Sequence, residues 1–454
     1  MERWRRGMTR REAVGLMGRF VAGVPLVSIA AACVGAQTTP AGASAAASAG
    51  ASGAAKKLGG SLSIIQWAHF VPAYDVFFDK WAKDWGTKNG VDVSVDHIAI
   101  ADLPARAASE AAQKSGHDIF GDFAQGAASL YENLNVDITD LVDNVGKKYG
   151  GWIPAAEAVA KVNGKWRALP DFFVPFPSLY RKDQFDQAGF PNGPVTWDDL
   201  LKAAPKLKAQ GHPPGTAYSQ TSDGEQTWRS LLWSYGASYF AKDGKTVAID
   251  SAETRDALRW GKDFYQYMDP AVLSWADVDN NTCLQSGRCS WIYNPISAYR
   301  TIEDQNKELI QNVYVNLPLK GPKAQICSIQ WTQYRVWSFT KNADAAKQFL
   351  IDYSDNWTDE FTASKGYDNP FLKDHAKKPM PVLGSDPKLQ ALQDVPSMIQ
   401  PFGYPGPAGV AAAEVLATHV ITDMFTEYCV RGKTLDDAIG GAAKRLQAIS
   451  DKYK

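Results

Sequence analysis

Two hydrophobic periods mark the start of the globular part of the chain. The apolar run at 62–65 is followed, between Tyr74 and Trp85, by aromatic residues that recur three and four positions apart, the period of one helix face. Valines then alternate with polar residues over 91–96, the period of a strand. The run Asp118-Ile119-Phe120 suits a third strand. The pattern predicts strand, helix, strand, helix, strand.

Strands that alternate with helices predict a parallel sheet covered on both faces. Ligands of such open sheets bind where the strands end at their carboxyl edge. Five polar or aromatic residues are predicted at that edge: Trp67, His69 and Phe70 after the first strand, and Asp122 and Gln125 after the third. The alternative for Asp122 is that it caps the next helix. Later helices are predicted to begin at Thr196 and Thr434, each of which has an acid three residues on.

The N-terminus has the pattern of an export signal. Arginines at the start precede an apolar run of 13 residues, Phe20 to Ala32, which ends in small residues. That run is shorter than the roughly 20 residues that a membrane-spanning helix needs. We expect an export signal over 1–32 and, because Ala, Gly and Ser dominate the segment after it, a flexible tether over 33–57. The alternative is an anchoring or amphipathic helix that is not cut.

Two short motifs refine this export signal. Three alanines before Cys33 resemble the lipobox of bacterial lipoproteins, which implies lipidation of Cys33 after cleavage. Simple cleavage without lipidation is the alternative. The sequence Thr9-Arg10-Arg11 resembles a twin-arginine export motif, with the Sec route as the alternative.

Charge and cysteine content limit the class of protein. The first 32 residues carry six arginines and two glutamates, so their removal takes the net charge from -1 to about -5. No basic patch then points to nucleic acid as a partner. About 400 residues remain, which suits two lobes. The cysteines other than Cys33 allow three disulfide pairings, of which we favour Cys283 with Cys289.

Several segments occur in a characteristic order. Residues 163–170 read N-G-K-W-R-A-L-P, 178–183 read S-L-Y-R-K-D, 188–191 read A-G-F-P and 196–200 read T-W-D-D-L. They resemble the G-K-x-x-A-L-P, L-Y-Y-N-K and P-x-T-W-D-E-L landmarks of extracellular solute-binding proteins of ABC transporters, of the sugar-binding type. Residues 283–290 stand where that family has F-x-x-G-K-A-A-M, and both cysteines depart from it.

The resemblance implies an α/β, two-lobed periplasmic-binding-protein-like fold (type II), in which each lobe is a mostly parallel sheet flanked by helices. The ligand would lie in the cleft between the lobes. Lobe 1 is expected to comprise 58–169 plus 318–366, and lobe 2 to comprise 170–317 plus 367–454. Such proteins do no chemistry and need no cofactor or metal. They act as monomers and deliver a small-molecule solute, here a saccharide, to permease subunits in the membrane.

A sugar ring has an apolar C–H face and a rim of hydroxyls, so its site needs flat aromatic surface and fixed donors and acceptors. With the five residues above, the candidate contacts are Asp171, Trp228, Tyr293, Asn294, Trp331, Gln333, Arg335 and Tyr404. The resemblance places Trp331 in a loop, as the platform for a sugar ring. Arg335 could bind a carboxylate or phosphate of the solute, or pair with a carboxylate of the protein.

Two alternatives remain open. The same fold could bind another solute, such as a glycerol phosphate or a polyamine. The chain could instead be a secreted carbohydrate-active enzyme, which would need two carboxylates at a defined separation. The sequence contains no G-x-S-x-G, H-E-x-x-H or phosphate-loop motif, and its six histidines are scattered. We therefore expect a binding protein and no enzyme, located outside the cytoplasm and anchored by lipid to the cell membrane.

Overall fold

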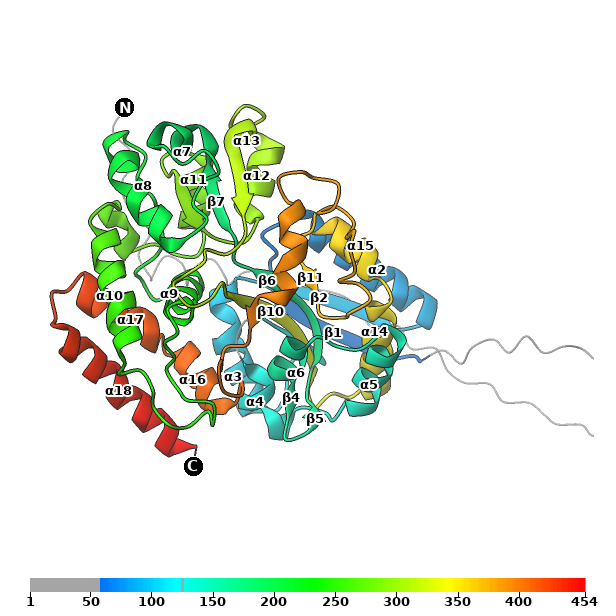
Figure 1. The fold of residues 1–454 in the computed structure, drawn as a ribbon. Helices are drawn as coiled ribbons and strands as arrows, with labels where there is room; N and C mark the ends of the chain where they lie inside the picture. Colours follow the sequence, from blue (N-terminus) through cyan, green and yellow to red (C-terminus); the bar gives the residue numbers. More distant parts are fainter. Residues whose placement is uncertain (1–57, 124–125, 454) are drawn as a thin grey trace, which may run out of the picture. The chain divides into compact units, whose positions relative to one another are not determined.

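The computed structural model describes residues 58–123 and 126–453 (Figure 1). The predicted export signal, the tether with Cys33, and Gln125 lie outside these residues. Within the described ranges, every helix is too short or too polar to cross a membrane.

The largest sheet of the described residues is mixed and combines strands from the early and the late parts of the chain. Its strand order is β11-β6-β10-β3-β1-β2, and β12 pairs with the start of β10. The strands are β1 (Ser61–Trp67), β2 (Asp92–Ile98), β3 (Ile119–Phe123), β6 (Leu169–Pro175), β10 (Cys327–Val336), β11 (Asn369–Pro370) and β12 (Ile399–Gln400). The three strands predicted from the opening pattern lie side by side and parallel, as expected.

The rest of the sheet differs from the predicted parallel arrangement. β10 runs antiparallel to both β3 and β6, and β11 runs antiparallel to β6. Parallel neighbours require a crossover of a dozen or more residues within one sheet, usually a helix. β10 instead enters the sheet from a second sheet, so no such crossover sets its direction.

The second sheet has three strands in the order β8-β7-β9, and both pairings are antiparallel. Its strands are β7 (Ser178–Arg181), β8 (Trp291–Tyr293) and β9 (Val313–Asn316), while β4 (Lys161–Val162) and β5 (Lys165–Trp166) form a separate hairpin. The chain passes between the two larger sheets at 176–177 and again at 317–326. The predicted lobe boundaries remain a prediction, although most of β6 and all of β11 pair with the large sheet rather than the small one.

Helices surround the sheets (Figure 1). In the first part of the chain they are α2 (Ala73–Asn89), α3 (Leu103–Gln113), α4 (Ala127–Leu130), α5 (Thr139–Lys148), α6 (Pro154–Ala160), α7 (Lys182–Ala188), α8 (Trp197–Ala209) and α9 (Ser222–Ser234). Next come α10 (Ala252–Tyr265), α11 (Asp279–Gln285), α12 (Ser297–Gln305), α13 (Leu309–Asn312), α14 (Ala343–Ser354), α15 (Trp357–Ala363), α16 (Val410–Ala417), α17 (Val420–Cys429) and α18 (Leu435–Lys452). Short 3-10 turns are η1 (Ile100–Asp102), η2 (Glu132–Leu134), η3 (Pro270–Leu273) and η4 (Gln390–Ser397).

The predicted caps are present at two of these helices. The side chain of Thr196 accepts from the backbone N–H of Asp199, and the Asp199 carboxylate accepts from the backbone N–H of Thr196. This reciprocal arrangement is a capping box. The side chain of Thr434 caps α18 by accepting from the N–H of Asp437, without the reciprocal bond to its own N–H. Local sequence signals therefore define these helix starts.

One disulfide joins Cys283 at the end of α11 to Cys289 before β8. The other two described cysteines, Cys327 and Cys429, are buried free thiols. Burial raises the pKa of each of these thiols to about 12. They are therefore protonated and unreactive at neutral pH.

Replacing both Cys283 and Cys289 by Ala should lower the free energy of unfolding by about 2 kcal/mol. The bond closes a short loop, so it removes little entropy from the unfolded chain. Urea denaturation with and without reductant measures this. Reductant should lower the wild-type stability to the value of the variant and leave the variant unchanged; an equal loss in both proteins would contradict the prediction.

An ion pair between β3 and β10 lies in the core of the large sheet. Asp122 and Arg335 are both 0% exposed. The guanidinium donates to both carboxylate oxygens of Asp122 through Nε and Nη2, and through Nη1 to Asn135 at 2.9 Å. Burial raises the pKa of Asp122, and Arg335 partly offsets that rise. Each charge is neutralised by the other.

Asp122→Leu should therefore lower the free energy of unfolding by roughly 3–5 kcal/mol, because it leaves Arg335 buried without a counter-charge. The double variant with Arg335→Met should be more stable than Asp122→Leu alone. Chemical denaturation measures both.

Asp256→Leu is the matched control, since it breaks an exposed pair with Arg259 and should cost less than about 1 kcal/mol. If the double variant were no more stable than Asp122→Leu, the role of the uncompensated charge would be disproved.

Candidate functional site

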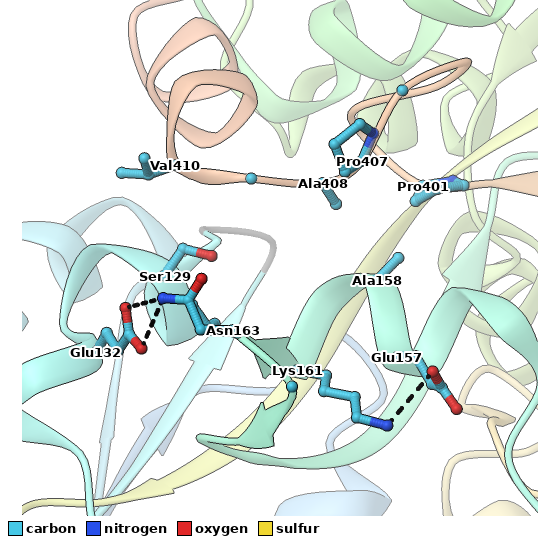
Figure 2. Close-up of a pocket in the computed structure, with 14 residues that line it drawn as sticks. Ser129, Glu132, Glu157, Ala158, Lys161, Asn163, Pro401, Pro407, Ala408 and Val410 are labelled. Atoms are coloured by element: carbon cyan, nitrogen blue, oxygen red, sulfur yellow. Dashed lines mark hydrogen bonds and ion pairs between the residues drawn. The ribbon is translucent and has the colours of Figure 1, made fainter. Parts of the chain in front are cut away.

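A cavity of about 680 Å³ opens between elements that follow β3 and a segment near the C-terminus (Figure 2). One wall comes from α4, η2, α6 and the β4–β5 hairpin. The other comes from the loop before α16. The lining residues are Ser129, Glu132, Glu157, Ala158, Lys161, Val162, Asn163, Gly164, Pro401, Gly406, Pro407, Ala408, Gly409 and Val410.

The first wall is polar and internally braced. Asn163 Nδ2 donates to both carboxylate oxygens of Glu132 at 3.0 Å. Lys161 Nζ lies 3.6 Å from a Glu157 oxygen and 5.2 Å from the ring centre of Trp166. Asn163 has a φ of 50°, in the left-handed region that Asn adopts more readily than most residues. The hairpin turn therefore fixes its amide at the edge of the cavity.

The opposite wall offers aliphatic surface and backbone from 401–410. Two aromatic residues anchor this segment from behind. Phe402 stacks on Trp331 with ring centres 5.0 Å apart and planes 8° apart, and Tyr404 packs edge-on against Trp233 at 5.5 Å. This wall is therefore held in place by the core rather than by contacts across the cavity.

The two walls meet beside the cavity. Gly126, just before α4, lies against Ala413 of α16, and a Cβ added to it would stand 2.5 Å from the Ala413 side chain. Its φ of 53° also favours glycine. Residue 126 therefore has to be small where the two walls touch.

The residues predicted at the end of the first strand form an aromatic cluster. Trp67 is 1% exposed, and its ring packs against His69 at 4.5 Å, Phe70 at 5.3 Å and Phe123 at 4.5 Å. His69 Nε2 lies 3.1 Å from Asp368 Oδ1. The structure thus brings these three predicted residues together, but their rings largely cover one another.

Asn294 belongs to a separate polar network beside α9. Asn280 Nδ2 donates to Asp223 Oδ2 at 2.7 Å and to Asn294 Oδ1 at 2.8 Å. Gln330 reaches the same helix start by donating to Ser222 at 2.6 Å. Burial, followed by the charge of Asp277, raises the pKa of Asp223 well above its usual value. This network connects α9, α11 and β10.

Three predicted contacts lie in a strand rather than a loop. Trp331, Gln333 and Arg335 are all in β10, and the prediction of a loop at Trp331 is wrong. Trp331 is 0% exposed, and Arg335 is paired with Asp122 in the core of the large sheet. Asp122 itself lies within β3 and does not cap a helix. A strand that is buried on both faces has no clean polar–apolar alternation, so its pattern was not recognised.

Two further predicted residues are in the interior, and a third is partly buried. Trp228 stacks on Phe425 at 4.8 Å, and Tyr293 of β8 is 1% exposed. Asp171 of β6 has no partner residue in the ladder with β10, whereas its neighbours Pro170 and Phe172 do. Its buried Oδ2 has no hydrogen-bond partner among the described residues. Burial, followed by the charge of Asp368, raises the pKa of Asp171 well above its usual value.

Sequence reasoning did not identify the polar wall of the cavity. Ser129 and Glu132 lie in short helices, Asn163 in a turn and Lys161 in the two-residue strand β4, where polar residues are common for structural reasons. The predicted contact Tyr404 lies in the Pro- and Gly-rich run at 403–407, and Gly406 and Pro407 of this run line the other wall. No group of three or more potential metal ligands occurs in the described part of the chain.

Comparison with known proteins identifies a matching protein family. Residues 80–363 match the model of the family described as bacterial extracellular solute-binding proteins. A protein of Brucella abortus (strain 2308), named only as a binding protein, is 26% identical over 240 residues, or 50% of this chain and 56% of that relative. A protein of Brucella suis with a similar name matches to the same extent. The chain therefore spans little more than half the length of these relatives.

Solved structures share the fold at low sequence identity. Maltose-bound MalE3 of T. maritima has a TM-score of 0.74 at 20% identity, covering 86% of this chain and 100% of that one. A sugar transporter of Arthrobacter chlorophenolicus A6 with bound laminaribiose has 0.73 at 18%, covering 86% and 98%. An ABC-transporter solute-binding protein of Agrobacterium radiobacter K84 in complex with ribitol has 0.73 at 15%, covering 86% and 99%.

These matches confirm the predicted two-lobed α/β fold class. The matched family consists of binding proteins rather than enzymes, in agreement with the sequence prediction. Because the family model covers well over half of the residues, the chain belongs to the bacterial extracellular solute-binding proteins.

Proposed function

We propose that the chain is the solute-binding component of an ABC importer and takes a saccharide or sugar alcohol into the cavity between the two walls. Structures of the same fold were solved with maltose, laminaribiose and ribitol. Delivery to membrane permease subunits follows from the same likeness. The solute would leave the site chemically unchanged.

The contrast between the two walls is the observation that carries this proposal. Ser129, Asn163 and the Glu157–Lys161 pair present hydroxyl, amide and charged groups on one side, while the 401–410 segment presents Pro, Ala and Val surface on the other. A sugar ring has the same two kinds of surface, a hydroxyl rim and a C–H face. The volume of about 680 Å³ lies in the range of roughly 300–1,000 Å³ that is usual for small-molecule sites.

A neutral solute fits this charge distribution better than a phosphate. Lys161 is the one basic residue among those that line the cavity, and Glu157 already lies beside it. A phosphate site would require several converging basic groups. The carboxylates of Glu132 and Glu157 are suited to accept hydroxyl hydrogens.

The proposed location follows from the N-terminal sequence. An export signal and an acylated Cys33 would hold the domain outside the cytoplasm, on a tether at the membrane surface. Mass spectrometry of the membrane-extracted protein tests this. A diacylglyceryl group on an N-terminal Cys33 is expected; an unmodified or uncut N-terminus would rule out lipidation of Cys33.

Binding can be detected without knowing the solute. Purified protein should show a higher melting temperature with at least one member of a panel of mono-, di- and oligosaccharides and sugar alcohols, because a ligand that binds only the folded state stabilises it by mass action. Glycerol phosphates and polyamines serve as the alternative solutes. Chromatography of the recovered sugar should show no product, and turnover would favour the enzyme alternative.

Gly409→Phe should weaken binding of that solute by more than tenfold, about 1.4 kcal/mol. A Cβ added at Gly409 would meet no atom within 4 Å, and its φ of −79° suits any residue, so the ring would extend into open space at the cavity wall. Isothermal titration calorimetry measures the affinity.

Gly440→Phe is the matched control, since a Cβ at that position on α18 also meets no atom within 4 Å and lies away from the cavity. It should bind with the wild-type affinity. Equal affinities of the two variants would place the solute elsewhere.

A further inference from the structure

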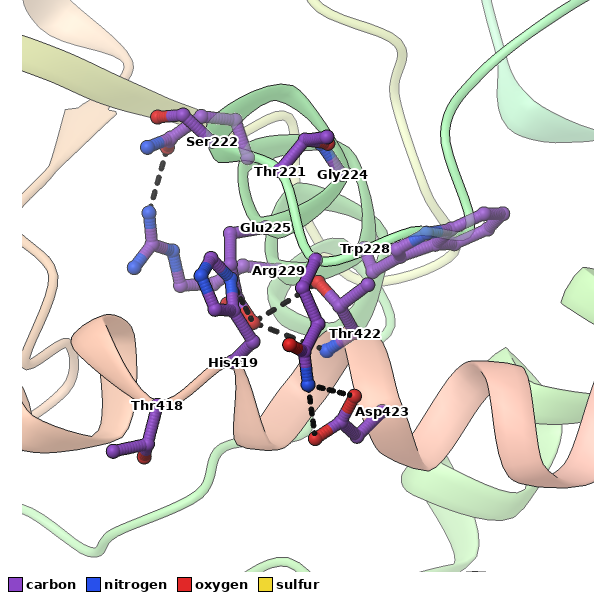
Figure 3. Close-up of polar contacts among 12 residues, drawn as sticks. Thr221, Ser222, Gly224, Glu225, Trp228, Arg229, Thr418, His419, Thr422 and Asp423 are labelled. Atoms are coloured by element: carbon purple, nitrogen blue, oxygen red, sulfur yellow. Dashed lines mark hydrogen bonds and ion pairs between the residues drawn. The ribbon is translucent and has the colours of Figure 1, made fainter. Parts of the chain in front are cut away.

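A group of buried hydrogen-bond donors lies on one face of α9. Gln226, Arg229 and Trp233 are spaced three and four residues apart, and Tyr239 follows the helix. All four side chains are at most 1% exposed. Arg229 Nη2 donates to Gln226 Oε1 at 2.7 Å, the contact drawn in Figure 3.

The remaining donors of this group have no acceptor among the described residues. They are Arg229 Nε, Gln226 Nε2, Trp233 Nε1 and the Tyr239 hydroxyl. The Arg229 guanidinium carbon lies 5.4 Å from the Trp233 ring centre. Burial raises the pKa of Tyr239, and the charge of Arg229 partly opposes that rise. Buried donors nearly always have a partner, so four together call for an acceptor.

Arg229 also makes no ion pair with the described residues. No Asp or Glu oxygen of the described residues lies within 4.0 Å of it, whereas buried Arg335 pairs with Asp122 and buried Arg300 pairs with Glu303. A buried charge without a partner is strongly unfavourable.

Glu225, one turn earlier on the same helix, does not fill this role. Its Oε1 instead accepts from the hydroxyl of Thr422 at 2.9 Å and from the backbone N–H of Thr422 at 3.2 Å (Figure 3). Burial raises the pKa of Glu225, and Arg229 partly opposes that rise. Its Oε1 therefore faces α17, while its buried Oε2 has no hydrogen-bond partner among the described residues.

We propose that a compact monovalent anion, a halide or a small carboxylate, binds beside Arg229 and accepts hydrogen bonds from this group of donors. The anion would neutralise the guanidinium in the way that Asp122 neutralises Arg335. Because Trp233 also packs against Tyr404, the site adjoins the segment that forms the apolar cavity wall. This inference does not depend on whether the cavity takes a sugar.

Thermal unfolding of the full chain at constant ionic strength tests the proposal, with sodium chloride replacing sodium gluconate stepwise. Wild-type protein should show a melting temperature that rises with chloride and then follows the mass-action curve of a single site. Arg229→Met should lose this chloride dependence. Arg259→Met, which removes an exposed arginine, should keep it. Sodium formate in place of chloride distinguishes a halide site from one that also accepts a carboxylate.

A second variant covers failure of Arg229→Met to fold. Trp233→Phe removes one donor and keeps the ring, so it should raise the chloride concentration at half-saturation several-fold. Crystals soaked in bromide should give an anomalous peak within hydrogen-bond distance of Arg229. An unchanged chloride response in both variants, or a bromide-soaked crystal with only water beside Arg229, would overturn the proposal.

Discussion

Strand β10 sets the main constraint on this fold, because it is buried at every one of its ten positions although half of its residues are polar. A buried polar group left without a partner costs about 1–3 kcal/mol. The partners come from different parts of the chain: Ser328 bonds Ser230 of α9, Tyr334 bonds Gln66 of β1, and Arg335 bonds Asp122 of β3. These hydrogen bonds to the side chains of β10 therefore fix the position of α9 relative to the strands of the large sheet. Helix α9 packs on the first residues of β10.

The sequence was sufficient to predict helices and strands where their formation depends on residues that are close in the chain. Helix α2 and the strands on either side of it were predicted from their periods, and the start of α8 from its capping box. The direction of β10 was not, because it depends on where the chain returns after building the second sheet. The pairing of Asp122 with Arg335 joins residues 213 positions apart, and nothing local distinguishes a carboxylate that neutralises an arginine from one that binds a solute.

The same limit applies to the candidate site. Trp67 and His69 were predicted together because both follow β1, and they do lie together. Residues such as Ser129 and Asn163 are ordinary turn and helix-start residues in the sequence. They become candidates only because the fold brings α4 and the β4–β5 hairpin opposite the 401–410 segment.

Two predicted contacts support the cavity from behind. Trp331 and Gln333 are two residues apart on β10 and therefore project from the same face of the strand. Trp331 stacks under Phe402 of the apolar wall. The amide of Gln333, oriented by its neighbours, donates to the carbonyl of Val159 at 2.8 Å and accepts from the N–H of Ala128 at 3.2 Å, in two helices of the polar wall.

Side chains of one strand, β10, thus contact both walls of the cavity. A change in the spacing between them must either bend β10, whose ladder continues on both sides, or break one of these two contacts. Stacked aromatic pairs contribute about 0.5–1.5 kcal/mol beyond their buried area, and a buried amide that loses both partners costs more. Of the two contacts with β10, the Phe402 stack is therefore the one that can shift at the lower cost.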